Sequence, residues 1–335
     1  MRFAKQLLIT GAALSATALL SCSIPKPECQ VGQTTYLSGW SGNDYAAFAV
    51  RYIPKGNVTC PTVFTGEVLG MQSYHPADPN DGQVRDFSKT SIAIRTENHG
   101  QLFFMVEDFM GPEAALAQKP NAEGPFAATE PDDQDFCFVN EISESRVTFT
   151  GATVPLTEDP CTSSEECNEL VYPGSTCEII DDQENTACSV VLPATDLSYK
   201  WSNVQVYVTA AAPGTQFKAD VTIELDGCAA EYTAVGMWPA VDCTDYAGTG
   251  AADDNFCNPE PDPESGRIIG SGINPDFGPV KCDTSVNVLP VVDRYATDLY
   301  LGYPLTVPRC TLATNEIPAL EGFSGGGGAG GAPAE

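Results

Sequence analysis

Apolar and polar side chains alternate along much of the chain with a period of two residues. The clearest case lies at positions 201–238, where every second residue from 204 to 208 is a valine. This period is typical of a strand with one buried face and one wet face. Turn residues at 212–215 (Ala-Pro-Gly-Thr) and at 226–227 (Asp-Gly) divide the stretch. We therefore predict three antiparallel strands joined by two tight turns.

Other runs rich in Val, Ile, Thr, Phe and Tyr also predict strands, because Gly, Pro, Asn and Asp bound them. A helix is expected only at 112–119, where a proline and an acid come first and a lysine last. Strands joined by hairpins must bury one face against a second sheet, so we predict a mainly β, antiparallel, β-sandwich-like fold. The further predicted strands cover 33–40, 45–53, 63–74, 90–96, 101–108, 136–140 and 146–150.

Changes in composition indicate how the chain is divided. We predict one β-rich domain over residues 29–320, with a small cysteine-rich insert at 156–192. Two separate β-rich halves on either side of that insert are the alternative. Residues 245–282 are rich in Asp, Glu, Pro and Gly and indicate a long acidic loop braced by disulfides. The glycine-rich stretch 321–335 has nothing to bury, so we expect a disordered tail.

Residues 1–21 have the layout of a secretory signal peptide. Two basic residues precede an apolar run at 7–20, which is shorter than the roughly 20 residues of a membrane-spanning helix. The run ends in Leu19-Leu20-Ser21-Cys22, which resembles the lipobox of bacterial lipoproteins. That resemblance implies cleavage before Cys22, lipidation of its sulfur, and a short tether at 22–28. An ordinary cleaved signal peptide, with Cys22 in a disulfide, is the alternative.

The charge of the chain is strongly negative. The sequence carries 45 acidic and 16 basic residues, a net charge of −29. Residues 1–21 contain two basic residues and no acid, so their removal would change −29 to −31. A field of this sign repels nucleic acid and anionic lipid head groups. Nucleic acid is therefore not an expected partner.

The cysteine count fits an exported protein. Thirteen is odd, and assigning Cys22 to the lipid leaves an even set of twelve. Compartments outside the cytoplasm are oxidising, so this set predicts up to six disulfides, whose connectivity the count leaves open. The twelve are Cys29, Cys60, Cys137, Cys161, Cys167, Cys177, Cys188, Cys228, Cys243, Cys257, Cys282 and Cys310.

Four of these cysteines form a compact run, Cys161-x5-Cys167-x9-Cys177-x10-Cys188. The run resembles short Cys-x5-Cys repeats in secreted proteins of myxobacteria and their relatives. The wider chain, over most of residues 29–320, resembles cysteine-rich lipoproteins of the same bacteria. The repeat resemblance implies that the first cysteine pairs with the third and the second with the fourth. Neither resemblance carries an activity to this chain.

Candidate catalytic chemistry is sparse. The only histidines, His75 and His99, lie in expected surface turns, and neither a zinc motif nor a nucleophile elbow is present. Calcium is the best cofactor candidate, because clustered carboxylate and carbonyl oxygens suit it. Solvated acidic loops without an ion are the alternative. The candidate ligands are Asp78, Asn80, Asp81, Asp132, Asp133, Asp135, Asp253 and Asp254.

These observations predict a lipid-anchored protein of the bacterial cell envelope with a binding or structural role and no catalytic activity. The membrane would be contacted through the lipid, and an envelope protein or glycan would be the partner. Ser23, rather than Asp, follows Cys22, which favours the outer membrane if the enterobacterial sorting rule applies. Two alternatives stay open: a secreted polysaccharide hydrolase that uses a carboxylate pair, and a calcium-dependent surface adhesin.

Overall fold

The computed structural model describes most of the chain between residues 27 and 317. The predictions for the signal peptide, for Cys22, for a strand at 33–40 and for the tail at 321–335 fall outside the described residues. Within them the fold is mainly β, with antiparallel sheets and cysteines joined in pairs, as predicted. The described ranges are 27–32, 47–155, 161–170, 176–179, 186–245, 248–263, 270–286 and 307–317.

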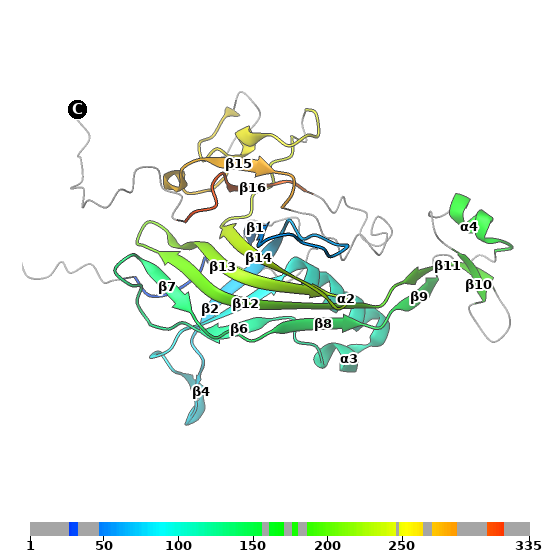
Figure 1. Ribbon diagram of the computed structural model, residues 1–335, viewed down its shortest axis with the longest axis horizontal. Helices are drawn as coiled ribbons and strands as arrows, with labels where there is room; N and C mark the ends of the chain where they lie inside the picture. Colours follow the sequence, from blue (N-terminus) through cyan, green and yellow to red (C-terminus); the bar gives the residue numbers. More distant parts are fainter. Residues whose placement is uncertain are drawn as a thin grey trace, which may run out of the picture.

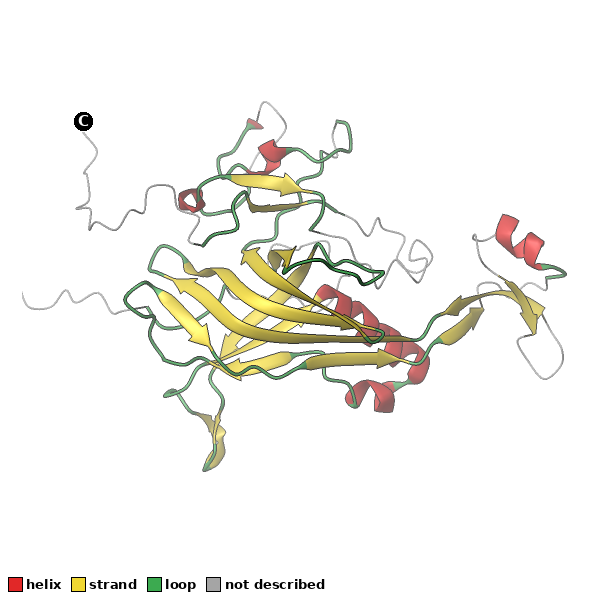
Figure 2. Cartoon of the chain, in the orientation of Figure 1, coloured by secondary structure: helices red, strands yellow, loops and turns green. Residues whose placement is uncertain are grey.

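A nine-stranded antiparallel sheet forms the body of the molecule (Figure 2). Its strand order is β6-β5-β2-β1-β14-β13-β12-β7, and β8 pairs with the same long strand β12 as β7 does. Strands from both sides of the cysteine-rich insert therefore belong to one sheet. The bounds are β1 (Phe48–Pro54), β2 (Gly66–Tyr74), β5 (Ser91–Thr96), β6 (Ala122–Pro125), β7 (Phe136–Val139), β8 (Ser145–Phe149), β12 (Thr195–Val208), β13 (Pro213–Leu225) and β14 (Cys228–Met237).

The sheet curls until its two edges nearly meet. Lys119, just before β6, exchanges two backbone hydrogen bonds with Arg146 of β8, at 3.0 and 2.7 Å. Ala127, just after β6, donates its N–H to the carbonyl of Phe138 in β7 at 2.8 Å. The buried face of one half of the sheet therefore packs against the other half of the same sheet. This closure takes the place of the second sheet that a sandwich would supply.

The three predicted strands at 201–238 are confirmed as β12, β13 and β14. Asp226 and Gly227 form the second turn with positive φ values of 51° and 81°. The first turn was predicted too far along the chain. The chain reverses at 209–212, where the N–H of Thr209 donates to the carbonyl of Ala212 at 3.1 Å, and Pro213 already begins β13.

The prediction of a strand at 101–108 is wrong. Helix α2 (Glu97–Met110) occupies this stretch, followed by α3 (Pro112–Leu116), which confirms the short helix expected there. Thr96 caps α2, since its side chain accepts a hydrogen bond from the N–H of His99 at 3.2 Å. Leu102 and Val106, four residues apart, are both fully buried in the main core. The helix helps to fill the interior of the curled sheet.

A second layer, built from the C-terminal part of the chain, covers the outer face of the sheet. Figure 1 shows its strands beside that face, and Val235 and Met237 of β14 pack there with Phe277 and Leu312. Two disulfides hold the layer together, so the predicted braced loop is present. Its elements are η2 (Asp254–Cys257), η4 (Pro275–Phe277), β15 (Val280–Asp283) and β16 (Arg309–Leu312).

Two structures project from the body (Figure 1). One is a short hairpin of β3 and β4, in which every residue of β4 is exposed. The other is the cysteine-rich insert, joined to the body by the pairing of β9 with β11. No helix among the described residues has the length and hydropathy needed to cross a bilayer. The bounds are β3 (Ala77–Asp78), β4 (Asp81–Arg85), β9 (Ala152–Pro155), α4 (Ser164–Leu170), β10 (Thr176–Ile179) and β11 (Thr186–Leu192).

Candidate functional site

The structure joins all twelve cysteines after Cys22 in six disulfides. Within the insert the pairs follow the order that the repeat resemblance implies, first with third and second with fourth. The other four disulfides link segments that lie 39 to 168 residues apart in the sequence. The pairs are Cys29–Cys137, Cys60–Cys228, Cys161–Cys177, Cys167–Cys188, Cys243–Cys282 and Cys257–Cys310.

The first described residues are fixed firmly to one end of the sheet. Cys29 is bonded to Cys137 of β7, and its N–H donates to the carbonyl of Thr129 at 2.8 Å. The N–H of Gly32 donates to the carbonyl of Gly214 at 2.8 Å. Gly214 has φ +73°, and a Cβ there would lie only 2.1 Å from the carbonyl oxygen of Gln30. We call this end, where residues 29–32 meet β7 and β13, the anchor end.

The cysteine-rich insert leaves the sheet at the opposite end of β12. Cys137 lies beside Val206 near the end of β12, whereas β11 and β9 join the body before its first residue, Thr195. At about 3.3 Å per residue, the 14 residues of β12 span roughly 45 Å. The insert itself has two disulfides and little apolar core beyond them. It is therefore held far from the anchor end.

The proposed calcium ligands of the first two loops are engaged in local turns. The Asp78 carboxylate accepts hydrogen bonds from the backbone and side-chain nitrogens of Asn80, and the Asp81 carboxylate accepts one from the N–H of Gln83. In the second loop the Asp132 carboxylate accepts the N–H groups of two residues that follow it, at 2.9 Å each. Asp133 and Asp135 belong to the same turn, where Asp135 has φ 65°.

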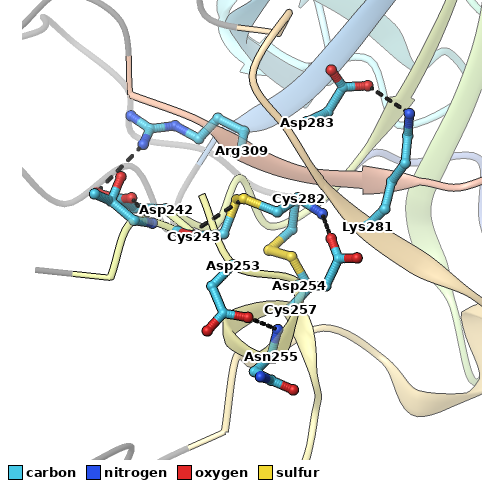
Figure 3. The surroundings of a disulfide bond; sticks show 12 residues. Asp242, Cys243, Asp253, Asp254, Asn255, Cys257, Lys281, Cys282, Asp283 and Arg309 are labelled. Atoms are coloured by element: carbon cyan, nitrogen blue, oxygen red, sulfur yellow. Dashed lines mark hydrogen bonds and ion pairs between the residues drawn. A yellow bond between two sulfur atoms is a disulfide. The ribbon is translucent and has the colours of Figure 1, made fainter. Parts of the chain in front are cut away.

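The third loop is shown in Figure 3. The carboxylate of Asp253 caps η2 by accepting the N–H of Asn255 at 2.9 Å. The carboxylate of Asp254 accepts the N–H of Cys282 at 2.6 Å. The two neighbouring acids thus bind different backbone groups, and both fasten the C-terminal layer around its disulfides.

Among the described residues, ligand atoms of three or more His, Cys, Asp or Glu side chains gather within 4.8 Å of one another in two groups only. Both groups consist of cysteines, one in the insert and one in the C-terminal layer. Every cysteine in them belongs to a disulfide. Metal ligation would require these bridges to be reduced, because the thiolate is the metal ligand.

The prediction that His99 lies in a surface turn is wrong. His99 is fully buried in α2. Its Nε2 donates to the carbonyl of Leu197 at 3.1 Å, and its ring meets that of Tyr199 edge-on, with 4.8 Å between the centroids. Burial lowers the pKa of this imidazole to about 4. The other histidine, His75, is partly exposed, and its Nδ1 lies 2.9 Å from the carbonyl of Lys89.

One buried acid is not among the site residues predicted from the sequence. Glu67 of β2 is fully buried inside the curled sheet. Its Oε1 accepts hydrogen bonds from the hydroxyls of Tyr52 at 2.8 Å and Tyr199 at 2.7 Å. Its Oε2 accepts the backbone and side-chain nitrogens of Asn98 at 3.1 and 2.9 Å. Four donors therefore surround one carboxyl group and link β1, β2, β12 and the start of α2.

Burial raises the pKa of the Glu67 carboxyl, and the four hydrogen bonds oppose that rise. Burial also raises the pKa of Tyr52 and of Tyr199 well above the usual value. Core aromatic side chains surround the Glu67 carboxyl group, and the ring of Trp201 stacks on that of Tyr199 with 6.2 Å between the centroids. The arrangement is that of a structural polar centre. Period two could have revealed it, because Glu67 shares a face with the buried Leu69 and Met71.

The chain is thus a disulfide-braced, antiparallel β protein whose nearly closed sheet is bonded to the preceding segment through Cys29. The family model MlpA matches residues 46–239, which is more than half of the chain, and the chain belongs to this family. It is also similar to a protein of Myxococcus xanthus named "Putative lipoprotein MlpA", with 37% identity over 101 residues. These matches confirm the resemblance to lipoproteins of myxobacteria.

The alignment with the Myxococcus protein covers 30% of this chain and 37% of that protein's length. No solved structure matches the chain.

Proposed function

We propose that this protein is a lipid-anchored component of the cell envelope that binds a partner and does not catalyse a reaction. The observation that carries the proposal is the clamp at the anchor end. Six residues separate Cys22 of the lipobox from Cys29, and Cys29 is bonded covalently to Cys137 of the sheet. A segment of that length spans at most about 25 Å. A lipid on Cys22 would therefore hold the body close to a membrane, because the short segment after Cys22 is bonded to the sheet at Cys29.

The opposite end of the molecule supports the binding role. The insert stands at the far end of β12 from Cys29, and the side chains of Ile179 and Val191 on it are 65% and 57% exposed. These two side chains would give the insert apolar area that a partner could bury. An anchored body with a distant module would present that module to another envelope component.

The membrane is the outer membrane in this proposal, and the relative's name supports attachment to a membrane through lipid. Two membrane signals already suffice for stable attachment, so three acyl chains on Cys22 would hold the protein firmly. The buried position of Glu67 and of His99 supports a role without catalysis, because both groups lie inside the core.

Metabolic labelling with palmitate tests the anchor. Wild-type protein and a Ser23→Ala variant should carry label and sediment with outer membranes. A Cys22→Ala variant should lose both the label and the membrane association. Retention of label by the Cys22→Ala variant would contradict the proposal. Crosslinking on intact cells, followed by identification of partners captured through residue 179 or 191, tests the binding role separately.

A further inference from the structure

A cavity of about 410 Å³ lies at the anchor end, between the sheet and the C-terminal layer. Its walls come from the start of β13 and the loop before it, from the residue after β14, and from residues 259–260 and 272–277 of the C-terminal layer. Ligand pockets are usually 300 to 1,000 Å³ and mainly apolar, with a few polar groups. An engineered cavity of about 150 Å³ holds one benzene ring. This cavity has room for a larger organic group.

The lining of the cavity is mostly apolar. The partly exposed ring of Trp238 and three prolines form the accessible walls, whereas Ile273 and Phe277 are only 3% and 1% exposed. The ring of Trp238 is held in place by the backbone beside it, since a Cβ on Gly32 would lie 3.1 Å from its Cγ. An apolar body could therefore leave water here against a preformed surface.

Two buried polar atoms of the lining residues have no hydrogen-bond partner among the described residues. They are Oγ1 of Thr215, a residue 7% exposed, and Nε1 of Trp238. The two residues are neighbours across the sheet, where the N–H of Trp238 donates to the carbonyl of Thr215 at 2.8 Å. Buried polar groups are normally paired, so these two atoms leave the wall incompletely satisfied, although neither atom is open to the solvent in the cavity.

The charge of the cavity has one sign. Glu260 and Asp276 line it and are exposed, whereas none of its described lining residues is basic. The whole chain carries a net charge of −29, which draws cations towards it and repels anions. An indole ring is also the best aromatic partner for a cation. Charge and lining therefore select the same kind of ligand.

We propose that this cavity binds an organic cation, with the apolar part of the ligand against Trp238 and the neighbouring prolines and its ammonium group towards Glu260 and Asp276. The inference deepens the binding role proposed above and does not depend on the lipid anchor. The site adjoins residues 29–32, so its ligand would be bound at the membrane-facing end of the anchored protein. The insert at the other end would remain free for a different contact.

Titration calorimetry with benzyltrimethylammonium tests the site, using purified full-length protein in a non-ionic detergent. We expect one cation to bind per chain. The double variant Glu260→Gln/Asp276→Asn should lower the affinity about tenfold. The matched control Asp108→Asn/Glu113→Gln removes the same charge from exposed positions on α2 and α3, and should change the affinity less than twofold. Methyl glucoside, a neutral polar ring, should not bind.

Several results would overturn the inference. Equal losses in the double variant and its control would mean that the overall field, not the cavity, attracts the cation. Undetectable cation binding to folded wild-type protein would remove the site. Binding of methyl glucoside in preference to the cation would assign the cavity to a neutral glycan. Palmitate labelling is independent of all three results, so failure of this inference can be told apart from failure of the anchor.

Discussion

Replacing Glu67 by methionine removes the one acceptor that four buried donors share. The hydroxyls of Tyr52 and Tyr199 and both nitrogens of Asn98 would lose their partner. A buried donor left unpaired costs about 1 to 3 kcal/mol. The hydroxyls can turn towards other acceptors, so we expect a total loss of about 3 to 6 kcal/mol in the free energy of unfolding.

Glutamine at position 67 is the matched control. Its amide oxygen can accept both nitrogens of Asn98, while its amide nitrogen donates to the two tyrosine hydroxyls, which are able to accept. It also avoids the desolvation cost of a buried charge. We therefore expect the Glu67→Gln variant to lie within about 1.5 kcal/mol of wild type at pH 7.

Urea unfolding with the disulfides intact measures both variants, and the pH dependence adds an independent check. The pKa of Glu67 is raised in the folded state, so folded protein binds the proton more tightly than unfolded protein. Relative to Glu67→Gln, wild type should lose stability as pH rises from about 4.5 through that raised pKa, and then level off. Equal stability of the methionine and glutamine variants, or a relative gain of wild type with rising pH, would refute this reasoning.

Three further predictions follow from single features of the structure. His99 is buried with a pKa of about 4, so its imidazole takes up a proton more readily in the unfolded chain as the pH falls. Between pH 7 and pH 4.5 the free energy of unfolding of wild type should therefore fall by about 2 to 3 kcal/mol relative to His99→Gln. Equal pH profiles in urea unfolding would contradict this. Gly227 has φ +81° and free space around it, so Gly227→Ala should lower the stability by about 1 kcal/mol through backbone strain alone. Gly82→Ala, also in open space, should be nearly neutral. Equal shifts in melting temperature for the two variants would contradict this prediction. Millimolar calcium should leave the melting temperature unchanged, because carboxylates in all three acidic loops already bind backbone amides; a calcium-dependent rise would support the adhesin alternative.

The strands β12 to β14 could be predicted from the sequence because their pattern is local. From Phe217 to Leu225 each buried residue alternates with a less buried one, and Asp-Gly at 226–227 is a strong turn dipeptide. The closure of the sheet could not be predicted in the same way. It depends on contacts such as those between Lys119 and Arg146, which period two does not encode.

The error at α2 has a physical explanation. Aromatic and apolar residues between positions 101 and 109 suit a strand, and Phe103-Phe104 in particular favoured that prediction. The helical spacing was nevertheless present, since positions 102, 105, 106, 109 and 110 are all apolar. Thr96 also offered an N-cap. The buried stripe of the helix is short, and the apolar residues 103 and 104 between its members obscured the helical spacing.

The polar centre and the cavity depend on segments that are distant in the sequence. Tyr199 lies 132 residues after the carboxyl group that it contacts. The cavity lies between the end of β14 and residues 259–260 and 272–277. Period two places Glu67 on the buried face of its strand, but only the folded structure shows which residues surround its carboxyl group. A tryptophan before a proline gives no sequence signal of the cavity. The calcium candidates illustrate the converse, because acids that are close in sequence serve separate turns.

Mass spectrometry of the amino-terminal peptide from protein isolated in its native host tests the anchor most directly. The account predicts that this peptide begins at Cys22, carries a diacylglyceryl group on sulfur and an acyl group on the new amino terminus, and remains linked through Cys29 to Cys137 until reduction. An unmodified amino terminus, or Cys22 paired with another cysteine in a disulfide, would contradict it.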